Sequence, residues 1–117
     1  MLIRRGDIFY ADLSPVPSAG EGGLRPFLIV QSYVGKKNSP TVIAVEITSE
    51  IPQTLLSTQV KIGASESGLS NDFVILLERI RMLDKLRLKE KIGHLDKQIM
   101  QNVDAAISES FGLGRKE

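Results

Sequence analysis

Two residues of this chain, an arginine and a threonine, stand where they could do chemistry together. Arg25 lies in "GEGGLRPFLIVQS", between a run of glycines and an apolar segment, and Thr48 ends the β-rich run "TVIAVEIT". A guanidinium carries several fixed N–H donors that match the oxygens of an anion, and a threonine hydroxyl adds another donor. If they lie side by side, the two side chains could bind a negatively charged oxygen group. Whether they do depends on the strands and loops that carry them.

Other catalytic arrangements find little support. The chain has no cysteine and one histidine, His94, which excludes disulfides, thiolate metal sites, a thiol nucleophile and any site that needs two histidines of one chain. The glycine-rich stretch lacks the Gly-Lys-Ser/Thr of a phosphate-binding loop, and "GASES" lacks the closing glycine of a nucleophile elbow. Glu46 and Glu78 could form a carboxylate pair for acid/base work, but the sequence gives no distance between them. We expect no metal and no cofactor.

The composition is that of an ordinary globular protein. The 117 residues are 42% hydrophobic and 25% charged, and we expect one domain over residues 1–117. A net charge of +1 gives no general attraction to nucleic acid. Between Arg79 and Lys97, however, seven basic residues face three acidic ones, although a solvated surface is the ordinary explanation for each of them. No apolar run reaches the ~18 residues of a membrane span, and no signal peptide is evident, so we expect a cytoplasmic protein without a membrane partner.

The local pattern predicts a mainly β fold. Runs rich in β-branched and apolar residues, bounded by turn residues, predict strands over Asp7–Leu13, Arg25–Ser32, Thr41–Thr48, Ser57–Ile62 and from Phe73 to about Met82. Short connections between them indicate a compact, mostly antiparallel barrel or sandwich. One helical turn is expected over Asp84–Leu88, and the segment "LKEKIGHL" is ambiguous between strand and helix.

The spacing of the apolar residues changes near the C-terminus from that of a strand to that of a helix. Apolar residues recur there at spacings of three and four, which predicts an amphipathic helix on the sheet: Ile99, Met100, Val103, Ala106, Ile107 and Phe111. Asp96 is the expected N-cap and Gly112 the expected C-cap.

The second and third strands are expected to pair as a hairpin in which the numbers of opposed residues sum to 73. In this register Arg25 faces Thr48. One face is then wholly apolar and should form the core: Pro26, Leu28, Val30, Ile43, Val45 and Ile47. The other face is mixed and suits a site or a subunit interface: Arg25, Phe27, Ile29, Gln31, Val42, Ala44, Glu46 and Thr48. A slip of one residue would turn Arg25 and Glu46 into the core, where an unpaired charge is costly.

Four segments together resemble the MazF/PemK family of toxin endoribonucleases: "RRGDIFYADLSPV", the glycines followed by "LRPFLIVQ", "SPTVIAVEITS" and "VILLERIRMLDKLRLKEKIGHLD". The resemblance runs from Ile3 to about Leu113 in unbroken order. It implies a small, SH3-like twisted β-barrel with a C-terminal helix. It also implies a homodimer whose interface carries an RNA-binding groove.

The same resemblance implies an activity and its residues. Such toxins cleave single-stranded RNA, chiefly mRNA, at short motifs without a metal, and thereby inhibit translation and growth. The RNA's own 2′-hydroxyl attacks the adjacent phosphorus, which leaves a 2′,3′-cyclic phosphate and a 5′-hydroxyl. The family's catalytic arginine and threonine map to Arg25 and Thr48, while the group that removes the 2′ proton stays undecided. The loop from Ser14 to Gly23 is expected to be a mobile flap over the RNA, and the RNA-binding residues are expected to be Ser18, Glu21, Gly22, Gly23, Glu78 and Arg79.

One position departs from the family pattern. Many members have glutamine where this chain has Arg79, which predicts altered base recognition beside Glu78. A cognate antitoxin protein is the implied partner. Two alternatives stay open: a CcdB-like inhibitor of DNA gyrase on a similar fold, without nuclease activity, and an SH3-like module that binds RNA or a peptide without chemistry.

Overall fold

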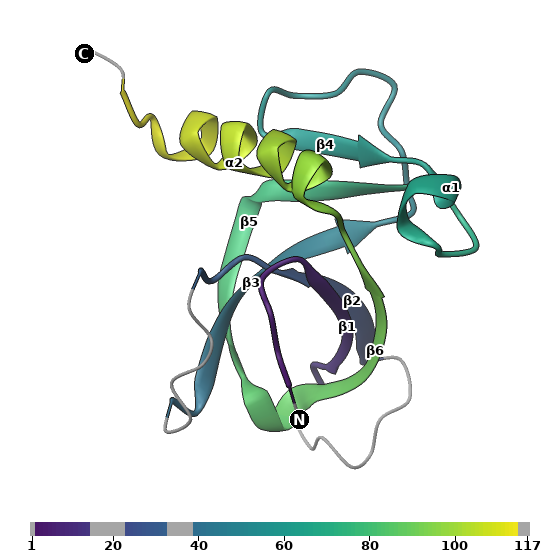
Figure 1. Ribbon diagram of the computed structural model, residues 1–117, viewed down its shortest axis with the longest axis vertical. Coiled ribbons are helices and arrows are strands. Elements are labelled where there is room, and N and C mark those ends of the chain that lie inside the picture. The colour runs from purple at the N-terminus through teal and green to yellow at the C-terminus, as the bar shows by residue number, and fades with distance from the viewer. Residues whose placement is uncertain (1, 15–22, 33–38, 115–117) are drawn as a thin grey trace.

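In the described part of the chain, six strands form a single antiparallel sheet, and the C-terminal helix packs on it (Figure 1). The computed structural model describes residues 2–14, 23–32 and 39–114. The strands are β1 (Asp7–Asp12), β2 (Leu24–Ile29), β3 (Thr41–Thr48), β4 (Gln59–Ile62), β5 (Phe73–Asp84) and β6 (Leu88–His94). The helical elements are α1 (Ala64–Ser67), the 3₁₀ turn η2 (Lys85–Arg87) and α2 (Lys97–Phe111).

The order of the strands in the sheet is β4-β5-β3-β2-β1-β6. The long strand β5 and the strand β6 are joined through η2 and curve round the end of the molecule that lies away from α2 (Figure 1). No ladder joins β4 to β6 within the described residues, so hydrogen bonding does not close the sheet. The expected mainly β, antiparallel fold with a C-terminal helix is confirmed, as a strongly curved sheet.

Two cores lie on opposite faces of the strands. The first core packs against α2: Ile8, Leu28, Val30, Val45, Ile47, Ile62, Phe73, Ile75, Leu77, Leu95, Ile99, Met100, Val103 and Ala106. The second core lies on the other face: Phe9, Ala11, Phe27, Ile29, Val42, Ala44, Leu83 and Leu88. Consecutive residues of one strand alternate between them, as with Ile8 and Phe9 in β1, because side chains along a strand point to opposite faces. The sheet is therefore buried on both sides over much of its length.

The hairpin register is confirmed where β2 and β3 pair. Phe27 opposes Glu46, Leu28 opposes Val45 and Ile29 opposes Ala44, and each pair sums to 73. Of the expected core face, Ile43 is instead 38% exposed and Pro26 is only half-buried. The opposite face was expected to be mixed and to suit a site or a subunit interface, which was wrong for Phe27, Ile29, Val42 and Ala44, because they are buried in the second core. The curvature of the sheet covers that face, and alternation within one hairpin does not reveal curvature.

Most element boundaries agree with the expectations to within a few residues. β3 has the expected bounds, η2 is the expected helical turn, and the ambiguous segment after it is the strand β6. The glycine- and serine-rich loop contains a short helix, α1, that the sequence pattern did not predict. In α2, the Asp96 side chain accepts a hydrogen bond from the Ile99 N–H, and Gly112 adopts the left-handed conformation, so both caps are confirmed. Phe111 was expected on the apolar face of the helix but is 61% exposed.

Candidate functional site

Three charged side chains meet where the start of β2, the last residues of β3 and the middle of β5 come together. The Arg25 guanidinium lies 3.4 Å from one carboxylate oxygen of Glu46, and the Arg79 guanidinium lies 3.6 Å from the other. The two arginine side chains are 59% and 62% exposed, whereas Glu46 is 20% exposed. One carboxylate therefore holds two accessible guanidiniums, and most of their N–H donors stay available to a ligand. We call Arg25, Glu46 and Arg79 the arginine cluster.

The backbone explains why these three residues meet. Because Phe27 opposes Glu46 in the hairpin, Arg25 lies just beyond the end of that ladder, close to Glu46. Val45 and Glu46 are consecutive, yet they pair with Ile80 and Leu76 of β5, which leaves residues 77–79 as an irregularity in that strand. This irregularity brings Arg79 to Glu46. Sequence reasoning expected Arg25 beside Thr48, but the ion pair that Arg25 makes is with Glu46.

Thr48 is the last residue of β3 and is half-buried. The Glu50 backbone N–H donates a hydrogen bond to Thr48 Oγ1 at 3.0 Å, which orients the hydroxyl. Within the described residues its own O–H donates to no acceptor. The hydroxyl can therefore donate one hydrogen bond to a bound ligand.

A small cleft of about 230 Å³ brings most of these groups together. Its lining residues are Glu46, Thr48, Glu50, Pro52, Gln59, Leu76, Glu78 and Arg79. The two carboxylate oxygens of Glu78 accept hydrogen bonds from Thr58 Oγ1 at 3.1 Å and from Gln59 Nε2 at 2.9 Å, which hold Glu78 against β4. Glu46 and Glu78 both line the cleft. The partners of Glu46 are guanidiniums, whereas the partners of Glu78 are a neutral hydroxyl and a neutral amide. The expected RNA-binding pair Glu78 and Arg79 thus lies beside Thr48.

Gly23 lies where the chain after β1 returns to β2. The Leu13 N–H donates to the Gly23 carbonyl at 2.8 Å, and the Arg87 guanidinium donates to the carbonyls of Asp12 and Ser14 at 2.9 and 2.8 Å. A Cβ atom at Gly23 would lie 2.7 Å from the Ser14 nitrogen, so this close approach requires glycine. The Ser14 hydroxyl and N–H donate to the Asp12 carboxylate and hold the pKa of Asp12 below its usual value. Ser18, Glu21 and Gly22, and the flap expected over Ser14 to Gly23 beyond its two ends, lie outside the described residues.

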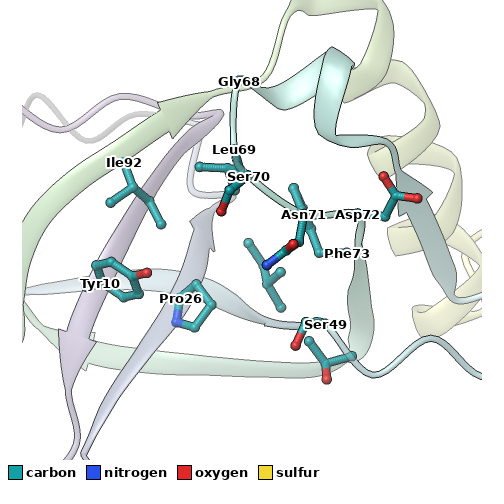
Figure 2. A pocket seen from close by; sticks show the side chains of 12 residues that line it. Tyr10, Pro26, Ser49, Gly68, Leu69, Ser70, Asn71, Asp72, Phe73 and Ile92 are labelled. Atoms are coloured by element: carbon teal, nitrogen blue, oxygen red, sulfur yellow. The ribbon is translucent and has the colours of Figure 1, made fainter.

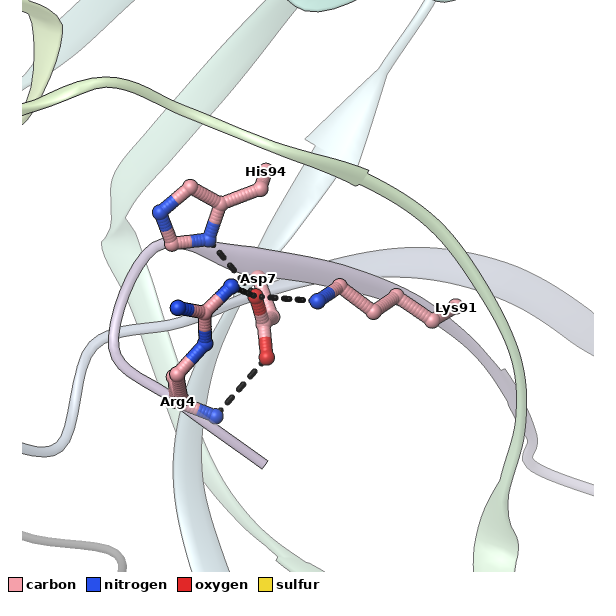
Figure 3. Close-up of polar contacts among 4 residues, drawn as sticks. All are labelled: Arg4, Asp7, Lys91 and His94. Carbon is pink, nitrogen blue, oxygen red and sulfur yellow. Dashed lines mark hydrogen bonds and ion pairs between the residues drawn. The ribbon is translucent and has the colours of Figure 1, made fainter. Parts of the chain in front are cut away.

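A second polar cluster surrounds Asp7, at the start of β1 (Figure 3). The carboxylate is fully buried and lies 2.6 Å from His94 Nδ1, 3.0 Å from Lys91 Nζ and 2.8 Å from the Arg4 backbone nitrogen. Burial raises the pKa of Asp7, but the hydrogen bonds from His94, Arg4 and Lys91 outweigh burial and set it below its usual value. An ionised carboxylate accepts only, so His94 Nδ1 carries the proton of this hydrogen bond.

The Asp7 cluster is separate from the arginine cluster. Ala11, four residues after Asp7 in β1, is the residue that opposes Arg25, so about 13 Å of strand lies between the two clusters at ~3.3 Å per residue. Sequence reasoning left His94 out of the site, and the structure gives it a partner within the sheet. Asp7 itself was missed, because a charged residue at the start of a strand gives no sign that it is buried.

Two further observations concern all the described residues together. Within residues 2–14, 23–32 and 39–114, no group of three or more histidine, cysteine, aspartate or glutamate side chains is arranged to hold a metal ion. None of the described helices is long and apolar enough to cross a membrane.

Comparison with known sequences gives a match over nearly the whole chain. Residues 4–111 match the family model for the PemK-like, MazF-like toxin of type II toxin–antitoxin systems. Endoribonuclease EndoA of Bacillus subtilis is 47% identical over 113 residues, which cover 97% of this chain and 97% of that protein. Endoribonuclease MazF of Staphylococcus saprophyticus is 49% identical over 112 residues, which cover 96% and 93% of the two chains.

Solved structures show the same fold at low sequence identity. A mycobacterial endoribonuclease in complex with its cognate antitoxin superposes with a TM-score of 0.77 at 23% identity, over 98% of this chain and all of that one. A MazE-MazF structure from Deinococcus radiodurans gives a TM-score of 0.75 at 19% identity, over 97% and 99% of the two chains. At this identity the structures support the fold, and the function rests on the sequence relatives.

Proposed function

The chain belongs to the PemK-like, MazF-like toxins of type II toxin–antitoxin systems, and from that premise we propose that it cuts single-stranded RNA at short motifs through the RNA's own 2′-hydroxyl. It is an endoribonuclease, as its relatives at 47% and 49% identity are. This assignment favours nuclease action over the two alternatives, gyrase inhibition and binding without chemistry. The observation that supports the chemical mechanism is the arginine cluster beside Thr48.

The proposed reaction is an internal transfer of the phosphoryl group. The 2′-oxygen forms a bond to phosphorus, the bond from phosphorus to the 5′-oxygen breaks, and the proton lost by the 2′-oxygen is balanced by one gained at the 5′-oxygen. The products are a 2′,3′-cyclic phosphate and a 5′-hydroxyl. Negative charge builds up on the phosphoryl oxygens and on the departing oxygen, so fixed donors aimed at those atoms lower the barrier.

The arginines supply that charge stabilisation in the proposal. A guanidinium binds phosphate oxygens through parallel N–H donors and keeps its charge at any physiological pH. Arg25 and Arg79 are exposed on their outer sides and held on their inner sides by Glu46. Glu46 thus acts as a positioning residue that holds Arg79 at the cleft and Arg25 beside it. These two cations are the reason to propose cleavage that needs no metal and no cofactor.

Thr48 is proposed to donate a hydrogen bond to the same phosphate. Its oxygen already accepts from the Glu50 N–H, which fixes where its proton can point. A threonine hydroxyl is a poor base at neutral pH, so we assign Thr48 a donor role and leave the removal of the 2′ proton to another group. DNA, which lacks the 2′-hydroxyl, is expected to bind without being cut.

The family also supports a proposal about partners. One structural relative is an endoribonuclease in complex with its cognate antitoxin, and we propose that this chain likewise has an antitoxin protein partner and acts as a homodimer on RNA in the cytoplasm. Growth inhibition by the free toxin would follow from cleavage of mRNA.

The test is to incubate the purified protein with a long RNA of mixed sequence in EDTA and to map the cut ends. We expect cuts at a short motif, with cyclic phosphate and 5′-hydroxyl ends. Arg25→Ala should abolish cutting while the circular dichroism spectrum stays unchanged. Arg4→Ala is the matched control, because Arg4 is a similarly exposed arginine, 55% against 59%, with a carboxylate partner at 4.0 Å. Normal cutting by Arg25→Ala would remove Arg25 from the mechanism, and a wild-type protein inactive in EDTA would remove metal independence.

A further inference from the structure

Thr48 also lines a larger pocket, of about 510 Å³. Figure 2 shows this pocket from close by. Residues from β1, β2, β3 and β6, with Ser49 just after β3, form one part of its wall, and the segment from Gly68 to Phe73 forms the rest. The volume lies in the range of pockets that bind small organic groups. Thr48 of the proposed site lines this pocket, but none of the residues expected from the sequence to bind RNA does, so most of the pocket has no role in the reaction proposed above.

The wall on the sheet side carries two rings and is apolar except for Thr48 and Ser49. Tyr10 opposes Pro26 in the pairing of β1 with β2, and both side chains face the pocket together with Ile92 of β6 (Figure 2). Tyr10 is 36% exposed although its strand neighbours Phe9 and Ala11 are buried. An accessible aromatic ring beside a proline ring gives a flat surface on which a planar group can pack.

The opposite wall mixes the apolar Leu69 and Phe73 with polar side chains, and part of its hydrogen-bonding capacity is unused. The Asn71 amide points toward the space between the two walls (Figure 2). Within the described part of the chain, the side chains of Asn71 and Tyr10 make no hydrogen bond. An amide offers two donors and an acceptor, and the Tyr10 hydroxyl offers one of each. The pocket thus combines a flat apolar wall with groups that can read the edge of a heterocycle.

Position ties this pocket to the arginine cluster. Thr48 is the lining residue that the pocket and the small charged cleft share. Arg25 and Pro26 are consecutive in β2, so their side chains point to opposite faces of the strand, and the link to the arginine cluster runs through Thr48. A phosphate bound at Thr48 would therefore lie where the two spaces meet. Proteins that recognise an RNA sequence commonly bind an unstacked base, which packs on an aromatic ring while its edge makes hydrogen bonds with the protein.

We propose that this pocket binds the base of a nucleotide next to the cleaved phosphate, and that Tyr10 and Asn71 help to set the cleavage motif. The inference rests on the proposed function for the identity of the ligand. Tyr10 and Pro26 pack against the plane of the base, and the Asn71 amide hydrogen-bonds its edge. In this arrangement Tyr10 and Asn71 do not touch the reacting atoms, so they act on the specificity of cleavage.

The first experiment measures binding without cleavage. A mixed-sequence DNA oligonucleotide is titrated into the ¹⁵N-labelled protein, and the side-chain amide signals of its asparagines are followed by NMR. We expect the Asn71 signals to shift and those of Asn102, which lies exposed on α2, to stay in place. Asn71→Ala should weaken binding about fivefold, the loss expected for one hydrogen bond. Asn102→Ala is the matched control and should bind as the wild type does. Unmoved Asn71 signals would overturn the proposal whether or not the protein cuts RNA.

The second experiment maps the cut ends of a long mixed RNA for Asn71→Ala, Tyr10→Phe and Asn102→Ala. We expect Asn71→Ala to relax the preference at one position beside the cut by about fivefold and to leave the other positions unchanged. Tyr10→Phe keeps the ring and should change the motif less than Asn71→Ala does. An Asn71→Ala protein that cuts the wild-type motif with wild-type preference at every position would refute the inference and leave the nuclease assignment standing. Loss of all cutting in the wild type would instead refute the proposed function.

Discussion

Asp7→Asn is expected to lower the free energy of unfolding by about 2 kcal/mol near neutral pH. The buried carboxylate accepts from His94 Nδ1, Lys91 Nζ and the Arg4 N–H at 2.6, 3.0 and 2.8 Å. Hydrogen bonds to a charged group contribute ~1.5–3 kcal/mol each. The three contributions cannot simply be added. The side chains of Lys91 and His94 are 38% and 39% exposed, so water replaces part of the hydrogen bonding that they lose in the variant. Asparagine also keeps one acceptor. The melting temperature should fall by about 8 °C.

The dependence on pH gives this prediction its sign. The pKa of Asp7 lies below the 3.8 of an unperturbed aspartate, so the ionised carboxylate favours the folded state. That stabilisation is fully present above pH 3.8 and is lost as the pH falls through the lower pKa of the folded protein. Asparagine does not titrate. The difference in unfolding free energy between wild type and Asp7→Asn should therefore be largest near neutral pH and should shrink in acid.

Urea unfolding followed by circular dichroism, repeated from neutral pH to well below pH 3.8, measures both quantities. Asp104→Asn is the matched control, because Asp104 also pairs with an arginine, Arg5, but its side chain is 54% exposed. We expect that change to alter the free energy of unfolding by less than about 1 kcal/mol. An equal destabilisation by Asp7→Asn at every pH would refute the reasoning, since a loss of packing alone does not titrate. A loss no larger than that of Asp104→Asn would refute the magnitude.

Two more predictions concern the nuclease site. Thr48→Val keeps the shape of the side chain but removes the hydrogen-bond donor, so RNA cleavage should slow by about 10²- to 10³-fold with unchanged thermal unfolding. Thr54→Val, at an exposed threonine, is the control and should cut at the wild-type rate. Equal cleavage rates for the two variants would remove Thr48 from the mechanism. Gly23→Ala would place a Cβ atom 2.7 Å from the Ser14 nitrogen and should lower the free energy of unfolding, measured in urea, by about 1–3 kcal/mol. A variant as stable as the wild type would show that the segments at Ser14 and Gly23 can move apart without loss.

The residues that could be placed from sequence are those whose partners lie in the same hairpin. The sum of 73 predicts the pairing of Phe27 with Glu46, because two β-rich runs joined by one turn leave few registers that keep charges out of the core. The same reasoning failed for the burial of Phe27 and Ala44. Their cover comes from β1, β5 and β6, which reach them only because the whole sheet curves.

The arginine cluster was predictable only in part. Arg25 stands out in the sequence because it is a charge between a run of glycines and an apolar segment, and Thr48 because it ends a strand. Arg79 comes to Glu46 through the irregularity at residues 77–79 of β5, and the β-rich run "VILLERIRML" gives no sign of where a strand will shift its pairing. The pocket beside Thr48 depends on a loop that passes over strands distant from it in sequence, so Tyr10 and Asn71 could not be brought together by local pattern.

The contact of Glu46 with two arginines bears on how the proposed site would release and recapture its substrate. At 3.4 and 3.6 Å both ion pairs are long, and both arginine side chains are more than half exposed, so their contribution to stability is at most about 1 kcal/mol each. A phosphate can therefore draw the guanidiniums away from Glu46 with little loss. When the RNA leaves, the carboxylate keeps two like charges together that would otherwise repel each other. A glutamate between two arginines thus keeps the cationic site assembled without occupying the donors that RNA needs.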